Sequence, residues 1–250
     1  MSHLHVERAT LPEVESFLRA HPYAILPLGS TEQHGPHLPL ATDTLLASAF
    51  CDRLAEKSGG LVLPAVPFGY SWTWRDLPGT LTLRFDTLLE VVRDIAESLA
   101  RSGVRALCTV TGHEANRGPL KYALRERIVD HVDIGVLNLF YPGMERILEE
   151  ADSPAWRGAL LHAEEVETSM MLATHPELVH GDRAVRDYPE APASYGMTAT
   201  TMGDLMASGV FGDATVADAG KGRRWLELST DEAARLWRDF LVEHEVRGAP

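Results

Sequence analysis

Short apolar runs alternate along the chain with segments whose apolar residues recur at helical spacing. The apolar runs predict buried strands, and the amphipathic segments predict helices. We expect strands at residues 24–29, 61–66, 105–111 and 133–140. We expect helices at residues 11–20, 44–57, 85–102, 119–131, 165–174 and 231–245. Strands that alternate with helices predict an α/β fold of three layers, in which helices flank a central, mostly parallel sheet.

Glycine and proline support several of these boundaries. Gly59 and Gly60 follow the second helix and Gly103 follows the third, where helices commonly end. Pro64 argues for an edge strand or a strand end, because proline cannot donate to a sheet ladder. Residues 182–219 are rich in Gly, Pro, Ala and Thr. We expect this stretch to be irregular and to cover a substrate site.

The composition fits one domain and narrows the range of partners. The chain has 250 residues, 45% of them apolar, enough for one substantial core across residues 1–250. It carries 36 acidic and 23 basic residues, for a net charge of −13. Such an acidic chain is a poor match for nucleic acid or an anionic membrane. Neither is therefore expected as a main partner.

The two cysteines and the missing targeting signals predict the cytoplasm. Cys51 falls in a helical pattern and Cys108 in an apolar strand, so both are expected to be reduced core residues. No apolar stretch reaches the roughly 18 residues that span a bilayer. The N-terminus lacks a basic region followed by an apolar one, so no signal peptide is expected.

The first cluster of chemically active residues follows the strand at 24–29. Glu32, His34 and Asp43 lie within twelve residues, and Pro36 and Pro39 stiffen the loop between them. Buried acids and histidines are costly unless they are paired or bound to a cation. The cluster therefore predicts the first half of a hydrolytic metal site. A polar loop with a hydrogen-bonded histidine is the alternative.

Asp43 stands where a helix is predicted to begin. Capping that helix is one role for its carboxylate. Bridging two cations, as two-metal hydrolases require, is the other. The sequence leaves both roles open.

A second cluster follows the strand at 105–111. His113 is well placed as a metal ligand, and Asn116 is expected to cap the next helix. Glu114 invites comparison with zinc proteases, but their motif needs a histidine four residues after His113, where this chain has Arg117.

A third cluster opens the helix at 165–174. Glu164 and Glu165 suit the first turn of a helix, where the helix dipole favours acids. Glu167 enters an apolar helix and needs a partner, for which a metal is a natural choice. His162 is a candidate proton donor or acceptor. Elsewhere, Trp72 and Trp74 form a substrate wall or pack in the core.

Together the three clusters resemble the creatininase (creatinine amidohydrolase) family. The resemblance rests on three segments and extends over most of the chain. The three segments are Gly-Ser-Thr-Glu-Gln-His-Gly-Pro-His from residue 29, Thr-Gly-His-Glu-Ala-Asn from residue 111, and His-Ala-Glu-Glu-Val-Glu-Thr-Ser from residue 162.

The resemblance implies a binuclear metal site in an α/β fold, and often a homo-oligomer such as a hexamer. Glu32, Asp43 and His113 would hold one divalent ion, and His34 would hold the other with Asp43 bridging. A further carboxylate completes the second ion. In the family's namesake it lies two residues after the histidine of the second motif, where this chain has alanine, so Glu167 is preferred and Glu114 is the fallback.

The same resemblance assigns His162 as the proton shuttle. The chain departs from the family where glycines become Glu114, Ala115 and Glu164, and we expect these side chains to alter the substrate pocket.

The resulting hypothesis is a hydrolase that cleaves the C–N bond of an amide or cyclic amide in a small polar molecule. Two divalent ions, Zn²⁺, Mn²⁺ or Fe²⁺, would share the attacking water, and His162 would protonate the leaving nitrogen. The alternatives are a metallopeptidase that trims a peptide end and a non-catalytic metal-binding relative. Glu114, Trp72 and Trp74 are the expected substrate-binding residues.

Overall fold

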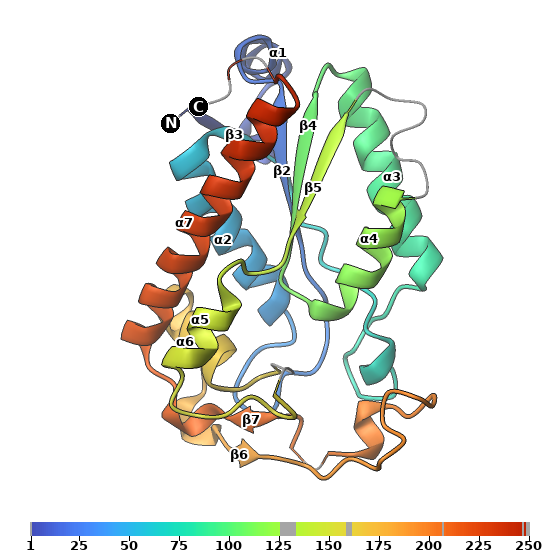
Figure 1. Cartoon of the computed structure of the whole chain (residues 1–250), viewed down its shortest axis with the longest axis vertical. Helices are drawn as coiled ribbons and strands as arrows, with labels where there is room; N and C mark the ends of the chain where they lie inside the picture. The colour runs from blue at the N-terminus through green and yellow to red at the C-terminus, as the bar shows by residue number, and fades with distance from the viewer. Residues whose placement is uncertain (1, 126–133, 159–161, 207, 247, 249–250) are drawn as a thin grey trace.

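A five-stranded sheet forms the centre of the computed structural model, which describes residues 2–125, 134–158, 162–206, 208–246 and 248 (Figure 1). The strand order is β1-β3-β2-β4-β5, and every neighbouring pair in it is parallel. The strands are β1 (His3–His5), β2 (Tyr23–Leu28), β3 (Gly60–Val62), β4 (Ala106–Thr111) and β5 (Gly135–Leu139). The predicted mostly parallel sheet is confirmed.

Helices cover both faces of this sheet, so the predicted three layers are also confirmed. The helices are α1 (Leu11–Ala20), α2 (Thr42–Ser58), α3 (Phe85–Arg101), α4 (Arg117–Arg125), α5 (Met144–Glu150), α6 (Glu165–Thr174) and α7 (Ala219–Glu243). Helices α2, α6 and α7 share one hydrophobic core with the sheet, whereas α1, α3 and α4 share the other. Figure 1 shows α7 and α2 on one side of the strands and α3 and α4 on the opposite side.

Successive side chains along the two central strands, β2 and β4, point to opposite faces of the sheet and so belong to different cores. Ile25 and Cys108 point into the core under α2 and α7, while Leu26 and Leu107 point into the core under α3. All four side chains are almost fully buried, and each large one contributes about 1.5–3 kcal/mol to folding. The two cysteines are buried and free, in agreement with the prediction from their apolar surroundings.

Several predicted boundaries hold, but the last helix begins much earlier than residue 231. Its start at Ala219 is capped by the Asp218 carboxylate, which accepts hydrogen bonds from the N–H groups of Gly220 and Lys221. Gly222 lowers the helix propensity of this segment, but the packing of α7 against α6 requires a glycine at this position. A side chain at this position would collide with the backbone of Ser169 in α6.

Other predictions need smaller corrections or fall outside the described residues. β3 lies between β1 and β2, so Pro64 marks the end of a strand and not an edge strand. Helix α4 is described only to Arg125, and residues 126–133, which were expected to complete it and begin β5, lie outside the described residues. Residues 182–219 are mainly irregular but contain the antiparallel pair β6 (Arg186–Asp187) and β7 (Gly212–Asp213).

Across the described residues, we find no helix of the length and apolar character needed to cross a membrane.

The pairing of β2 with β4 brings the first two clusters of polar residues together. Leu28 at the end of β2 lies opposite Thr111 at the end of β4. The chain therefore leaves both strands at the same edge of the sheet, where ligands of α/β folds collect. Helix α2 begins directly against this edge, because Gly112 has no side chain to keep the Asp43 backbone away.

Candidate metal centre

Six acidic and histidine side chains meet beyond the carboxyl ends of β2 and β4. They form three overlapping groups whose nitrogen and oxygen atoms lie within 4.8 Å of one another. The groups are Glu32–Asp43–His113, His34–Asp43–Glu167 and Glu32–His34–His162. All six residues are buried. The three clusters that are far apart in sequence thus converge on one point.

Asp43 stands at the centre of this arrangement. Its Oδ1 lies 3.2 Å from Nε2 of His34, and its Oδ2 lies 3.4 Å from Nδ1 of His113. The capping role is wrong, because α2 begins one residue earlier and Ala41 occupies the cap position. Each carboxylate oxygen therefore faces a different histidine, which is the geometry of a bridging ligand.

The outer nitrogens of two histidines are held by backbone carbonyl groups. Nδ1–H of His34 donates to the carbonyl oxygen of Glu32 over 3.1 Å, and Nε2–H of His113 donates to that of Tyr70 over 3.2 Å. In each neutral ring the inner nitrogen then keeps its lone pair and points at Asp43. Such outer hydrogen bonds fix the tautomer of metal-binding histidines.

Only one of the three acids at the start of α6 turns toward the cluster. Glu164 caps the helix by accepting from the N–H groups of Val166 and Glu167, and Glu165 pairs with Lys221 at 2.7 Å. Glu167 instead places Oε2 3.8 Å from Nε2 of His34. The same oxygen accepts the N–H of Ala163 at 2.5 Å.

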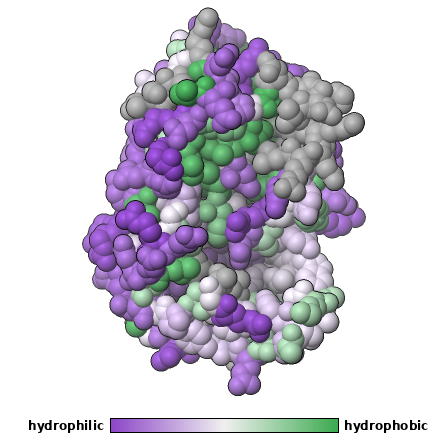
Figure 2. Space-filling view, viewed as in Figure 1, coloured by the Kyte–Doolittle hydropathy of each residue, from purple (hydrophilic) through white to green (hydrophobic). Residues whose placement is uncertain are grey.

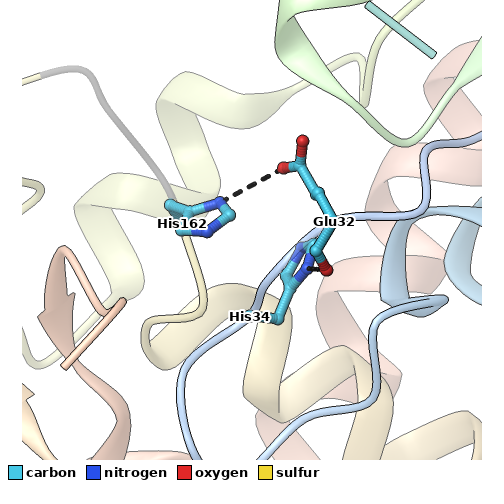
Figure 3. Close-up of side chains that lie close together, drawn as sticks. All are labelled: Glu32, His34 and His162. Carbon is cyan, nitrogen blue, oxygen red and sulfur yellow. Dashed lines mark hydrogen bonds and ion pairs between the residues drawn. The ribbon is translucent and has the colours of Figure 1, made fainter. Parts of the chain in front are cut away.

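His162 lies on the remaining side of the cluster. Its Nδ1 is 3.7 Å from Oε1 of Glu32, and Figure 3 shows the ring facing that carboxylate with His34 beside it. Trp74 stacks on the ring with centroids 4.2 Å apart and planes 21° from parallel. Phe211 meets the ring at its edge. The ring is therefore fixed in a defined orientation.

Close packing of these charges shifts their pKa values strongly. Burial lowers the pKa of His34, but the Asp43, Glu167 and Glu32 carboxylates outweigh burial and raise it to about 10. The pKa of His113 is likewise raised, because Glu32 and Asp43 outweigh its burial. Burial raises the pKa of Glu167 to about 7, even though His34 opposes the rise.

The burial of unpaired atoms tests whether a cation fits this cluster. Both carboxylate oxygens of Glu32, Nε2 of His34 and Oδ2 of Asp43 are buried without a hydrogen-bond partner among the described residues. Each such atom costs about 1–3 kcal/mol if it stays unpaired. Divalent cations bind this mixture of carboxylate oxygen and imidazole nitrogen, so the donor set fits a metal centre.

Two of the other predicted site residues lie apart from the cluster. Glu114 is 3.7 Å from Arg117 and lines an open groove of about 1250 Å³ together with Tyr141. Figure 2 shows hydrophobic side chains running down this face of the molecule, between α7 and α4. Trp72 carries the guanidinium of Arg75 over its ring at 3.9 Å. Trp74 touches the cluster through His162.

The structure also reveals a role for Asn116 that the sequence did not indicate. Its Oδ1 accepts the N–H of Tyr70 at 2.8 Å, while its Nδ2 donates to Gly29 and to Thr111. Asn116, which directly precedes α4 as predicted for a helix cap, therefore also ties three loops around the cluster together. The sequence carries no signal for these contacts, because the partners are distant along the chain.

Tyr141 was also not singled out from the sequence. It follows β5, has a φ of 33° and is buried, and its hydroxyl has no partner within the part of the chain that is described.

The sheet and the cluster define an α/β protein with a candidate metal centre at the carboxyl ends of its strands. The creatinine amidohydrolase family model matches residues 7–237. The chain belongs to the creatininase family and is a hydrolase of that family.

Individual relatives agree with this assignment. Creatinine amidohydrolase of Pseudomonas putida is 34% identical over 231 residues, covering 86% of this chain and 88% of that protein. The mycofactocin precursor peptide peptidase of Mycobacterium ulcerans is 31% identical and covers 87% of this chain and 85% of its own length. A crystal structure of creatinine amidohydrolase superposes with a TM-score of 0.82 at 33% identity, covering 96% of this chain and 99% of the other.

Proposed function

We propose that this protein hydrolyses the C–N bond of an amide or cyclic amide in a small polar substrate, using two divalent ions per chain. The observation that carries the proposal is the position of Asp43, whose two oxygens face His34 and His113 separately. A carboxylate shared in this way suits a pair of neighbouring cations. The unpaired buried atoms of Glu32 and His34 support the same interpretation.

The ligand sets follow from the two groups that contain Asp43. Glu32, Asp43 and His113 would hold one ion, and His34, Asp43 and Glu167 the other. Glu167 is preferred over Glu114 because its Oε2 approaches His34 while Glu114 pairs with Arg117. When bound, such ions lower the pKa of water toward neutrality and polarise a carbonyl oxygen.

The chain's own residues supply the remaining steps. His162 faces Glu32 with Nδ1, so it can accept a proton at this atom and return it to the leaving nitrogen. Trp74 holds the imidazole by stacking on it. Glu114 and Trp72 stay our candidates for contacting the substrate at the edge of the site.

Zinc and manganese are the first metals to test. Solved creatininases include a zinc–zinc form of a mutant, with a TM-score of 0.80, and a manganese form, with a TM-score of 0.81. Iron fits the same nitrogen and oxygen donors and belongs in the same experiment.

Elemental analysis of the purified protein, followed by activity assays, tests the proposal. We expect two equivalents of metal per chain, loss of activity with a chelator and recovery with one of these ions. The panel should contain creatinine, other small cyclic amides and simple linear amides. Two-metal binding without hydrolysis of any compound, including peptides, would leave a metal-binding protein and contradict the proposal.

A peptidase is the second candidate. The match to the peptidase from Mycobacterium ulcerans covers 87% of this chain, against 86% for the creatininase. Short peptides assayed beside the cyclic amides distinguish the two, because a peptidase should prefer peptides by a large factor in kcat/KM.

We also propose a cytoplasmic homo-oligomer, such as a hexamer. The two free buried cysteines support a reducing compartment. The homo-oligomer is what the resemblance to the creatininase family implies. Light scattering coupled to gel filtration tests the subunit number.

A further inference from the structure

The side-chain amide of Gln33 distinguishes His162 from the other two histidines of the cluster. The outer nitrogens of His34 and His113 each face a backbone carbonyl group, which accepts a hydrogen bond. The outer nitrogen of His162, Nε2, lies 2.9 Å from the carbonyl oxygen of Gln33 and also 2.6 Å from Nε2 of the Gln33 side chain. One residue thus offers both an acceptor and a donor to the same ring atom.

Contacts on the far side of the amide fix which of its ends faces the ring. Oε1 of Gln33 accepts the N–H of Gly35 at 3.0 Å, so the NH₂ group turns toward His162. The neighbouring chain encloses this amide tightly. A Cβ built on Gly209 would lie 2.0 Å from the same Oε1. The amide therefore has little space in which to rotate or move away.

The imidazole is just as restricted. Trp74 stacks on its face, Phe211 meets its edge, and only Nδ1 faces the carboxylate of Glu32. With the ring held in place, the proton distribution between its two nitrogens depends on the partners of Nε2. The Gln33 carbonyl stabilises a proton on Nε2, whereas the Gln33 amide stabilises a lone pair there.

We propose that Gln33 is a positioning residue that lets His162 exchange between its two neutral tautomers. In the exchange, the N–H bond at Nε2 breaks and one at Nδ1 forms, with water carrying the proton, so the net charge does not change. His162 can then meet the reacting atoms with either a lone pair or a proton at Nδ1. Among the described residues, the outer nitrogens of His34 and His113 have no second partner of this kind, so each neutral ring keeps its inner lone pair for a cation.

This inference rests on the proposed function for its catalytic meaning, but the tautomers can be measured without a substrate. The experiment is ¹H–¹⁵N NMR of ¹⁵N-histidine-labelled protein loaded with zinc, with His162→Asn used to assign the ring signals. We expect intermediate nitrogen shifts for His162 and single-tautomer shifts for His34 and His113. The last two serve as internal controls.

Gln33→Met removes the amide while keeping the length of the side chain. In this variant His162 should become a single tautomer with its proton on Nε2, while the spectra of His34 and His113 stay unchanged. On any substrate that the wild type hydrolyses, kcat should fall by about 10- to 100-fold, the range for outer partners of site residues, with KM changed less than twofold.

A second pair of variants keeps the test decisive if Gln33→Met folds poorly. Gly209→Ala pushes on the amide without changing Gln33, and it should shift the His162 signals toward the same single tautomer. Gly103→Ala is its matched control, since Gly103 has a similar φ of 91° against 84° but nothing within 4 Å of a new Cβ. It should leave the His162 signals unchanged.

Three results would overturn the inference. They are a wild-type His162 fixed with its proton on Nε2, a His162 whose Nδ1 shows the shift of a zinc-bound nitrogen, and a Gln33→Met spectrum identical to the wild type. Each is read from the resting protein, so it is separate from the failure of every panel substrate to react, which would contradict the proposed function instead.

Discussion

Oδ1 of Asp43 and Nε2 of His34 lie 3.2 Å apart, although one belongs to the first turn of α2 and the other to the loop after β2. Both atoms are buried. In the proposed site this pair would hold one ion, and the second oxygen of Asp43 would help to hold the other.

Asp43→Asn should therefore cost both metal and activity. The amide keeps the shape of the side chain but removes the charge that two cations share. We expect loss of at least half of the bound metal and a fall in kcat/KM of about 100-fold or more, at the upper end for site residues. Elemental analysis and steady-state assays on the same preparation measure both effects.

Glu164→Gln is the matched control for Asp43→Asn. Glu164 is also buried, but its oxygens accept the N–H groups of Val166 and Glu167 and cap α6. Its amide variant should keep the metal and lose about 1 kcal/mol of stability, as expected for a weakened cap. Equal metal loss in the two variants would contradict the bridging role of Asp43.

Zinc binding should release protons. Neighbouring carboxylates outweigh burial and raise the pKa of His34 to about 10, so at pH 7 the metal-free ring carries a proton on Nε2. A cation needs the lone pair of that nitrogen, and the proton must leave when the ion binds. Apparent zinc affinity should therefore rise with pH from 6 to 9, and the release should fade as the pH approaches 10.

Isothermal titration in buffers of different ionisation enthalpy counts these protons. We expect at least one per chain at pH 7, with a matching change in the pH dependence of the dissociation constant. A heat that does not vary with the buffer would mean that His34 stays protonated and is no ligand.

Cys51 and Cys108 should be inert in the native protein. Both thiols are fully buried, and burial raises the pKa of each, so the reactive thiolate is scarce. Dithionitrobenzoate at pH 8 should label neither thiol until guanidinium unfolds the chain, after which both react. Fast labelling of a folded, monodisperse sample would contradict the packing of the core beneath α2.

Ala163→Gly should leave stability almost unchanged. Ala163 has a φ of 53°, a left-handed conformation that favours glycine, and its N–H donates to Glu167. Relief of this strain should offset the added freedom of glycine in the unfolded chain to within about 0.5 kcal/mol. Urea unfolding measures the difference.

Ala96→Gly provides the comparison for Ala163→Gly. Ala96 is buried in the middle of α3, where glycine brings no relief of strain. It should cost about 1–2 kcal/mol from lost helix propensity and a lost buried methyl group. Equal costs at the two positions would show that Ala163 is not strained.

Local sequence patterns predicted the layers of this fold well. Helix α1 has the bounds that its amphipathic pattern indicates, and α6 begins and ends where its acids and apolar residues predict. The pattern failed at the start of α7, because Gly222 reflects contact with the backbone of α6 and not a break in the helix. Local propensity cannot report a constraint that comes from a neighbouring helix.

In the candidate site, too, local patterns indicated some residues and could not indicate others. Glu32, His34, Asp43 and His113 could be predicted as candidate metal ligands, because few other physical roles explain these residue types at this spacing. The contact of Gln33 with His162 joins residues 129 positions apart in the sequence, and the hydrogen bond from Asn116 to Gly29 joins residues 87 positions apart. Such contacts depend on tertiary packing, so no pattern along the chain predicts them.

The alignment of Leu28 with Thr111 has a consequence for how this protein would acquire the proposed ions. Neither the segment around Glu32 nor the one around His113 holds a complete donor set, and only the finished pairing of β2 with β4 unites them. Ion capture should therefore be a late event in folding that reports a correctly assembled sheet. A fragment that stops short of β4 should bind zinc no better than an unstructured peptide.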